Sequence, residues 1–121
     1  MTSESRVDSL QELRDALRTF AAARDWDQFH SPKNLAMAIS VEAGELLENF
    51  QWTVEAQSAL LPPESVAKVE EEIADVLLYL VRLADKLEID LLRAARRKMA
   101  LNAERYPVSK AKGSSRKYTQ F

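Results

Sequence analysis

The sequence of 121 residues has no cysteine, a single histidine, two glycines and four prolines. Without cysteine, neither a disulfide framework nor a thiolate zinc site can form. The single histidine excludes a multi-histidine metal site within one chain, although a metal could still be held by oxygen atoms. No apolar run approaches the roughly 20 residues of a membrane span, and the N-terminal M-T-S-E-S-R lacks a signal-peptide core. We therefore expect a soluble cytoplasmic protein with no membrane partner.

Charge is unevenly distributed along the chain, although the formal net charge is only −2. Four of the 17 basic residues lie beyond Ser109, in a tail without acidic residues, so the remainder carries 13 basic and 19 acidic residues. An acidic body argues against duplex nucleic acid as the main partner. A small polyanion could still bind if metal ions and local cations neutralise it.

Scarce glycine and proline, with abundant Leu, Ala, Glu and Arg, predict an all-α protein. Capping signals and apolar periodicity predict four helices and hence a four-helix bundle. The first predicted helix begins near Asp8 or Ser9. The second runs from Ser31-Pro32 to about Phe50 to Trp52, the third from Pro62-Pro63 to near Leu87, and the fourth from after Asp90 to before Pro107. The core stripe of the third helix should comprise Ile73, Val76, Leu77, Leu80, Leu83 and Ala84. We expect one helical domain over residues 1–108 and a basic, mobile tail over residues 109–121.

Two acidic pairs are the main chemical signal. Glu42 with Glu45, and Glu72 with Asp75, are each spaced i, i+3, which places both carboxylates of a pair on one helix face. Both pairs lie in apolar segments, where an unpaired charge is costly to desolvate, and residues 34–67 contain no cation. Converging carboxylates would favour a hard divalent ion, Mg²⁺ or Mn²⁺. The alternative is a solvated helix face, the usual place for acidic residues.

Magnesium sites are often completed by substrate phosphates, so the acids also hint at phosphate chemistry. A di-iron carboxylate bundle would need Glu-x-x-His motifs, and His30 lies three residues from no glutamate. Gly44, inside the helical pattern, leaves two interpretations open. It is either a tolerated glycine or a close helix crossing, or it leaves room beside Glu42 and Glu45 for a ligand or a facing helix.

Aromatic residues surround the predicted acidic cluster. Trp52 and Tyr79 are expected to flank it, and Trp26, Phe29 and His30 precede the second helix. Each ring taken alone is more often a core residue than a ligand contact. Several rings beside a metal would suit a flat nucleobase. Asn102 is either an exposed amide or a reader of a base edge, and its position alone does not decide between them.

Five sequence motifs together resemble the dCTP pyrophosphatases, a branch of the MazG-like all-α nucleoside triphosphate pyrophosphohydrolases. They are R-D-W-D-Q-F-H-S-P-K-N-L-A, V-E-A-G-E-L-L-E-N-F-Q-W, E-E-I-A-D-V-L-L-Y-L, K-M-A-L-N-A-E-R-Y-P and S-S-R-K-Y-T. The resemblance implies a four-helix subunit assembled into homo-oligomers, usually tetramers. It also implies Mg²⁺-dependent cleavage of a deoxynucleoside triphosphate to the monophosphate and pyrophosphate. The alternatives are another nucleotide, such as dUTP or dTTP, or a non-catalytic helical interaction module.

The resemblance also assigns roles to individual residues. It implies that four acidic residues bind the catalytic metal, namely Glu42, Glu45, Glu72 and Asp75. It implies that five residues line the nucleotide pocket, namely Trp26, His30, Trp52, Tyr79 and Asn102. It adds as further substrate-binding residues Lys98, Tyr106, Arg116 and Lys117, the last two from a tail segment that could reach the phosphates. One departure concerns base selectivity, because Leu17 stands where a dCTP-specific relative has a histidine.

Overall fold

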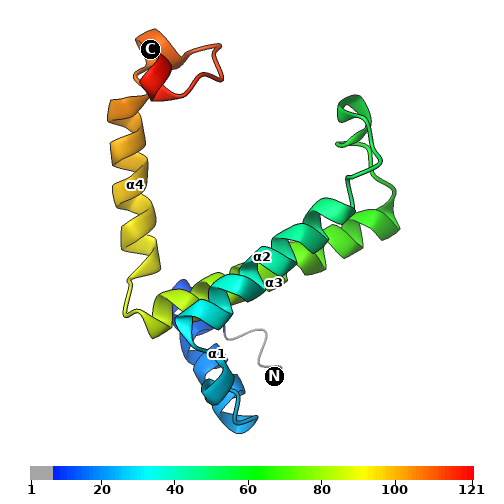
Figure 1. Ribbon diagram of the computed structural model, residues 1–121, viewed down its shortest axis with the longest axis vertical. Helices are drawn as coiled ribbons and strands as arrows, with labels where there is room; N and C mark the ends of the chain where they lie inside the picture. Colours follow the sequence, from blue (N-terminus) through cyan, green and yellow to red (C-terminus); the bar gives the residue numbers. More distant parts are fainter. Residues whose placement is uncertain (1–6) are drawn as a thin grey trace. The chain divides into compact units, whose positions relative to one another are not determined.

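The computed structural model describes residues 7–121, and this part of the chain contains helices and no strand, which confirms the all-α prediction. It forms two compact units, one ending at Ile89 and the other comprising Asp90–Phe121 (Figure 1). The helices of the first unit are α1 (Leu10–Ala23), η2 (Asp27–Phe29), α2 (Pro32–Glu48), η3 (Glu55–Gln57) and α3 (Pro63–Lys86). The second unit contains α4 (Leu91–Arg105), α5 (Val108–Ala111) and η4 (Tyr118–Gln120). No helix among the described residues is long and apolar enough to span a membrane.

The first unit is organised around an antiparallel hairpin of α2 and α3. These two helices make the most extensive contact between elements, and α1 packs on α3 (Figure 1). His30, just before α2, contacts Arg82 near the end of α3, which confirms that the helices run in opposite directions. The segment of residues 49–62, which contains η3, joins them at the end of the hairpin away from α1. Residues facing one another across the hairpin are therefore far apart in sequence.

Local capping chemistry sets where the helices begin. The side-chain oxygens of Ser9, Ser31 and Asp90 accept hydrogen bonds from backbone N–H groups three residues later, at 3.1, 3.1 and 3.0 Å. Each bond satisfies an N–H group that the first helical turn leaves without a partner. These starts agree with the prediction, and α2 ends slightly earlier than expected, at Glu48.

Both α1 and α3 end in a left-handed turn formed by a residue other than glycine. Asp25 and Glu88 have φ of 54° and 55°. The following N–H groups, of Trp26 and Ile89, donate back to carbonyls five residues earlier at 2.9 and 2.8 Å. This pattern closes a helix and redirects the chain, and it usually uses glycine. The turn at Asp25 leads directly into the segment that carries Trp26 and His30.

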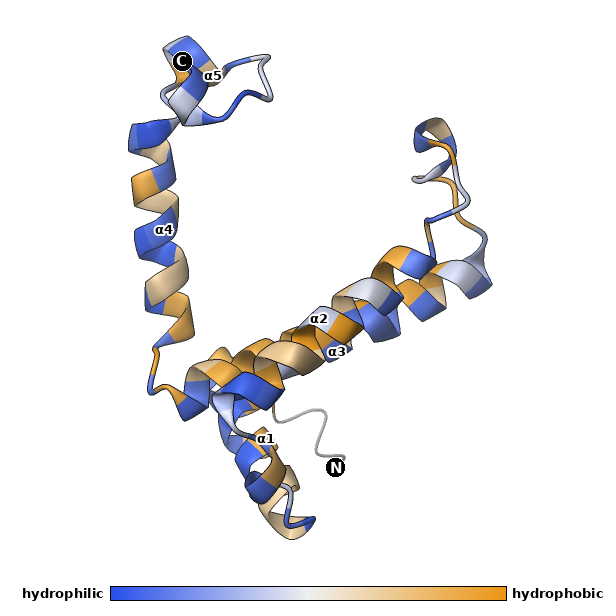
Figure 2. Cartoon of the chain, in the orientation of Figure 1, coloured by the Kyte–Doolittle hydropathy of each residue, from blue (hydrophilic) through white to orange (hydrophobic). Residues whose placement is uncertain are grey.

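The core of the described residues is small. The apolar side chains that are buried are those of Ala21, Leu35, Val81 and Ala84. Of the predicted α3 stripe, Ala84 is buried, whereas Ile73, Leu77 and Leu80 are 54%, 40% and 40% exposed. Figure 2 shows apolar residues continuing along both helices of the hairpin. The four-helix bundle stays a prediction, because α4 belongs to the second unit.

The second unit is held together by aromatic contacts at its C-terminal end. The ring of Tyr106 meets the rings of Tyr118 and Phe121 edge-on, each at a centroid distance of 5.8 Å. The Arg105 guanidinium lies 4.6 Å from the centre of the Tyr118 ring. These contacts connect the tail to the end of α4. The predicted division into a domain of residues 1–108 and a mobile tail of residues 109–121 stays a prediction.

Candidate metal and nucleotide site

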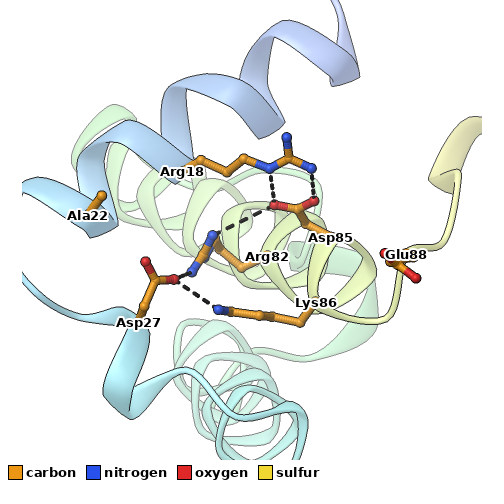
Figure 3. Close-up of a pocket in the computed structure, with 7 residues that line it drawn as sticks. All are labelled: Arg18, Ala22, Asp27, Arg82, Asp85, Lys86 and Glu88. Carbon is orange, nitrogen blue, oxygen red and sulfur yellow. Dashed lines mark hydrogen bonds and ion pairs between the residues drawn. The ribbon is translucent and has the colours of Figure 1, made fainter.

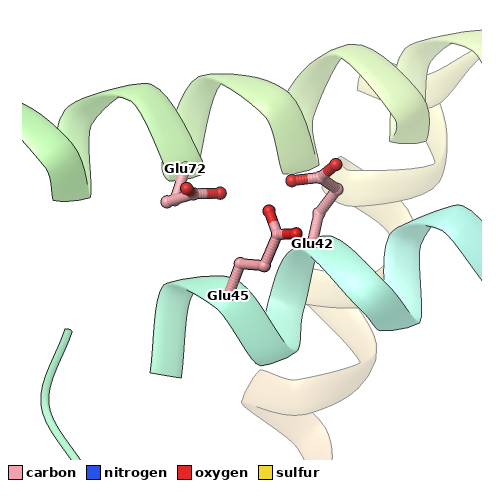
Figure 4. A group of neighbouring side chains, drawn as sticks. All are labelled: Glu42, Glu45 and Glu72. Atoms are coloured by element: carbon pink, nitrogen blue, oxygen red, sulfur yellow. The ribbon is translucent and has the colours of Figure 1, made fainter. Parts of the chain in front are cut away.

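Three of the four predicted acidic ligands converge between α2 and α3. One carboxylate oxygen each from Glu42, Glu45 and Glu72 lies within 4.8 Å of the other two (Figure 4). Glu42 and Glu72 are half-buried and Glu45 is exposed. Within the described part of the chain, the buried Oε2 atoms of Glu42 and Glu72 have no hydrogen-bond partner. Buried oxygens of this kind are rare and need an explanation, such as an ion.

The pKa values of the clustered glutamates also indicate a site that favours a cation. Desolvation by burial raises the pKa of the Glu42 carboxyl to about 7, and the neighbouring Glu45 and Asp75 add to the shift. Desolvation, followed by the charge of Glu45, also raises the pKa of Glu72. Ionisation of the whole set is therefore unfavourable unless a cation is present. Protonation relieves the repulsion in one way, and a bound divalent ion would do so in another.

Asp75, the fourth predicted ligand, is not one of the three converging acids. It lies one turn beyond Glu72 on α3, is half-buried, and its charge contributes to the raised pKa values of both Glu42 and Glu72. Its role as a metal ligand stays a prediction. The donor set as a whole consists of oxygen atoms, which suits Mg²⁺ or Mn²⁺ better than softer metals.

Trp26 and His30 lie together at the start of α2. Their rings meet at a centroid distance of 6.2 Å, and the Trp26 ring also contacts Phe20 edge-on at 5.6 Å. Trp26 is 42% exposed, so one part of its surface remains open to a ligand. The structure thus brings two of the predicted nucleotide-pocket residues into one aromatic group.

Tyr79 and Trp52 occupy different parts of the hairpin. Tyr79 is half-buried on α3, one turn beyond Asp75 and therefore close to the acidic cluster. Trp52 is 89% exposed in the segment after α2. The 17 residues of α2 separate Trp52 from His30, a length of about 26 Å at 1.5 Å per residue. The described chain does not bring these two rings together, and a shared nucleotide pocket stays a prediction.

The remaining predicted site residues belong to the second unit. Lys98 and Asn102 are exposed on α4 and, being four residues apart, share one helix face. Tyr106 caps the end of α4 and anchors the tail. Arg116 and Lys117 precede η4, where the Lys117 N–H donates to the Gln120 side chain at 3.1 Å. Their roles in substrate binding stay predictions.

Comparison with known proteins identifies the family. The model of the MazG-like family matches residues 37–121. The chain belongs to the MazG-like family. It is 46% identical to dCTP pyrophosphatase 1 of Rattus norvegicus and 45% identical to that of Homo sapiens, each over 115 residues that cover 93% of this chain and 68% of the relative. These relatives confirm the resemblance to the dCTP pyrophosphatase branch.

A solved structure of similar fold supports the assignment. The crystal structure of a pyrophosphatase from Archaeoglobus fulgidus superposes with a TM-score of 0.74 at 46% sequence identity. The match covers 84% of this MazG-like chain and 94% of the archaeal one. The helical arrangement is therefore shared with a pyrophosphatase.

The sequence analysis missed an ion-pair network in this MazG-like chain (Figure 3). Arg82 donates to Asp27 at 2.7 Å, Lys86 donates to the same oxygen at 2.9 Å, and Arg18 pairs with Asp85. An open pocket of about 470 Å³ lies here, lined by Arg18, Ala22, Asp27, Arg82, Asp85, Lys86 and Glu88. None of the predicted site residues lines it. The sequence contains one indication of this network, because Arg82 lies on the same helical stripe as Glu72, Asp75 and Tyr79.

Proposed function

We propose that this chain is a Mg²⁺-dependent pyrophosphohydrolase that converts dCTP or a modified dCTP to the monophosphate and pyrophosphate, and so cleanses the nucleotide pool. The observation that carries the proposal is the pair of buried, unpartnered carboxylate oxygens of Glu42 and Glu72 on facing helices. The similarity to dCTP pyrophosphatases supports the nucleotide. Mn²⁺ could replace Mg²⁺, since both prefer oxygen ligands.

The metal ligands in this proposal are Glu42, Glu45, Glu72 and Asp75. The first three already bring one carboxylate oxygen each to within 4.8 Å of the other two. When bound, the cation would offset the negative charge of the carboxylates and of the triphosphate. An oxygen-only donor set explains how the site works without cysteine and with a single histidine.

The reaction is an attack by water on the α-phosphorus. A carboxylate of the cluster orients the water and accepts its proton while the new bond between oxygen and phosphorus forms. The bond from the α-phosphorus to the oxygen bridging the α and β phosphates breaks, and that oxygen leaves with pyrophosphate. The chain contributes mainly by positioning and by electrostatic stabilisation.

The aromatic and basic residues bind the nucleotide. Trp26 is 42% exposed and is the ring proposed to stack on the base, and His30 contacts it. Base stacking on such a ring contributes about 1–3 kcal/mol. In this proposal Arg116 and Lys117 are the phosphate-binding residues of the tail, and Lys98 is a further substrate-binding residue. The resemblance to dCTP pyrophosphatases supports nucleotide-binding roles for Asn102, Tyr106 and Trp52.

We further propose that the subunit is a four-helix bundle in a homo-oligomer, most simply a tetramer. Large apolar side chains on the hairpin are exposed, among them Met37, Val41 and Leu47 at 52%, 60% and 65%. An apolar face of this kind is typical of a protein interface. A second copy could also bring Trp52 near Trp26 and His30, which one described chain keeps apart.

A pyrophosphate-release screen tests the function. Purified protein is incubated with dCTP, 5-modified dCTP, dUTP, dTTP and the purine deoxynucleotides, with Mg²⁺, with Mn²⁺ or with a chelator. We expect metal-dependent release of pyrophosphate, fastest with dCTP or a modified dCTP. Fastest release from dUTP or dTTP would assign another nucleotide to the same fold. Absence of release from every nucleotide would favour a helical interaction module.

A further inference from the structure

Arg82 is the buried charged residue in the core of the described chain. It is 4% exposed, on an α3 stripe that also carries Tyr79 and Asp75. Its guanidinium reaches across to the segment before α2 and contacts two side chains there, those of Asp27 and His30. A buried arginine is costly to desolvate unless it is fully paired, so this position calls for a specific role.

The contact with His30 determines which ring nitrogen carries the proton. Nε of Arg82 lies 3.3 Å from Nδ1 of His30, and Nη2 of Arg82 lies 3.2 Å from the same atom. Arginine has five donors and no acceptor. Nδ1 must therefore accept, and in a neutral imidazole the proton then sits on Nε2. His30 is left with an Nε2–H donor available to another molecule.

Asp27 fixes the segment that carries His30. One of its carboxylate oxygens accepts hydrogen bonds from Arg82 at 2.7 Å and from Lys86 at 2.9 Å (Figure 3). These two cations on α3 hold η2 in place. Trp26 immediately precedes Asp27, and its ring contacts the His30 ring. Loss of Arg82 would release the imidazole and leave the contact between Asp27 and Lys86 to hold the short helix between Trp26 and His30.

The charges around His30 favour the neutral ring. Burial lowers the pKa of His30, and the positive charge of Arg82 lowers it further. Asp27 acts in the opposite direction and Lys86 adds a smaller lowering effect. These groups come from η2 and from α3, the two elements that face the imidazole. Near pH 7 the ring is therefore an uncharged donor.

We propose that Arg82 is a positioning residue that fixes His30 as an Nε2–H donor to a hydrogen-bond acceptor of the bound nucleotide. The proposal rests on the proposed function for its ligand, whereas the tautomer rests on the geometry of the chain alone. A neutral donor recognises an acceptor atom such as a pyrimidine carbonyl oxygen or unprotonated ring nitrogen. An imidazolium would instead bind any phosphate oxygen with little discrimination.

The tautomer can be measured in the wild-type protein without any substrate. His30 is the only histidine in the sequence, so NMR of protein labelled with ¹⁵N in the imidazole ring reports one residue. We expect an unprotonated Nδ1, a protonated Nε2 and a pKa below the ordinary value for histidine. A protonated Nδ1 in the neutral ring would overturn the proposal.

Variants then test the role of Arg82 in binding. Arg82→Met should allow both tautomers of His30, raise its pKa and increase KM for dCTP about tenfold or more, with a smaller change in kcat. Lys86→Met is the matched control, because it removes the other cation on Asp27 and leaves the contact between Arg82 and His30. A folded Arg82→Met protein with unchanged His30 signals would overturn the proposal. If the variant does not fold, the wild-type spectrum still decides the tautomer.

The two proposals fail in different ways. An Nε2–H signal in a wild-type protein that releases no pyrophosphate from any nucleotide would confirm the tautomer and overturn the proposed function. Pyrophosphate release by a wild-type protein with a protonated Nδ1 would support the function and overturn the role of Arg82.

Discussion

At the scale of single residues, the acidic cluster combines burial with repulsion between like charges. Two of its oxygens are buried without a hydrogen-bond partner in the described chain. Buried polar atoms without a hydrogen-bond partner are rare in proteins, and a bound ion is one explanation for them. In the proposed function a bound cation stabilises the ionised form of the cluster, so we expect catalysis to depend on protonation of these carboxylates.

Removing a single charge from the cluster should stop turnover. We expect Glu45→Gln or Asp75→Asn to lower kcat by about 100-fold or more, because a bound metal contributes several kcal/mol to the transition state. Pyrophosphate release under saturating Mg²⁺ measures the effect, and circular dichroism should show unchanged helicity. Glu48→Gln is the matched control, since Glu48 is exposed on the same helix. Near wild-type activity in either test variant would refute the metal assignment.

The raised pKa of Glu42 also predicts how pH affects stability without metal. Its folded pKa of about 7 exceeds its ordinary value of 4.5, so between these values the folded state binds more protons than the unfolded state. The free energy of unfolding should therefore fall as pH rises from about 4.5 through about 7. Glu72, whose pKa is also raised, acts with the same sign.

Urea unfolding in the presence of a chelator, at several pH values across this range, measures the effect. Asp27 and Asp85 act at lower pH, because their pKa values are lowered from an ordinary value of 3.8. The lowered pKa of His30 acts in the opposite direction below about pH 6.5, so the difference between the wild type and Glu42→Gln isolates the contribution of Glu42. Adding Mg²⁺ at neutral pH should restore stability, since the ion binds the ionised cluster. A Glu42→Gln variant with the same pH dependence as the wild type would contradict the assignment.

At the scale of elements, Gly44 is an interruption in α2 that local packing does not require. An added Cβ at this position would meet no atom within 4 Å. The described chain therefore contains no close helix crossing at Gly44. Glycine in a helix interior costs about 1 kcal/mol relative to alanine, and nothing packed against Gly44 in the described chain explains that cost.

Gly44→Ala separates the two interpretations of this residue. We expect the free energy of unfolding measured with urea to rise by about 1 kcal/mol, because alanine has the higher helix propensity. If the open space admits nucleotide or a facing helix, KM for dCTP should rise or assembly should weaken at the same time. Unchanged activity and assembly would show that Gly44 is simply tolerated.

At the scale of the whole molecule, the first unit has too little buried apolar surface for its length. Its buried apolar side chains among the described residues are two alanines, one leucine and one valine. The apolar stripe expected on α3 is real as a pattern, yet half of its members remain substantially exposed. We expect a further surface to cover them, as the proposed assembly would.

Assembly should therefore appear as a dependence of stability on concentration. We expect the midpoint of thermal unfolding to rise with protein concentration, since dissociation accompanies unfolding in an obligate oligomer. Light scattering coupled to size-exclusion chromatography should give the mass of four chains of 13.7 kDa. A monomer whose midpoint is independent of concentration would contradict the proposed assembly.

Much of the architecture could be predicted because it depends on local chemistry. Ser9, Ser31 and Asp90 cap helices where the sequence indicates, and Pro62 and Pro63 mark the start of α3. The ends of α1 and α3 were harder to predict, because Asp25 and Glu88 take a conformation that usually signals glycine. The i, i+3 spacing of each acidic pair is likewise a local property.

The sequence by itself determined the helical class, the helix starts and the restriction to oxygen ligands, since these follow from composition, capping, the absence of cysteine and the presence of a single histidine. Only the tertiary structure decided that Glu72 meets Glu42 and Glu45, 30 and 27 positions away. It also decided that Arg82 contacts His30, 52 positions earlier. Such pairs depend on the register of two antiparallel helices, which local spacing does not specify. The same packing shows how much apolar surface one chain leaves uncovered.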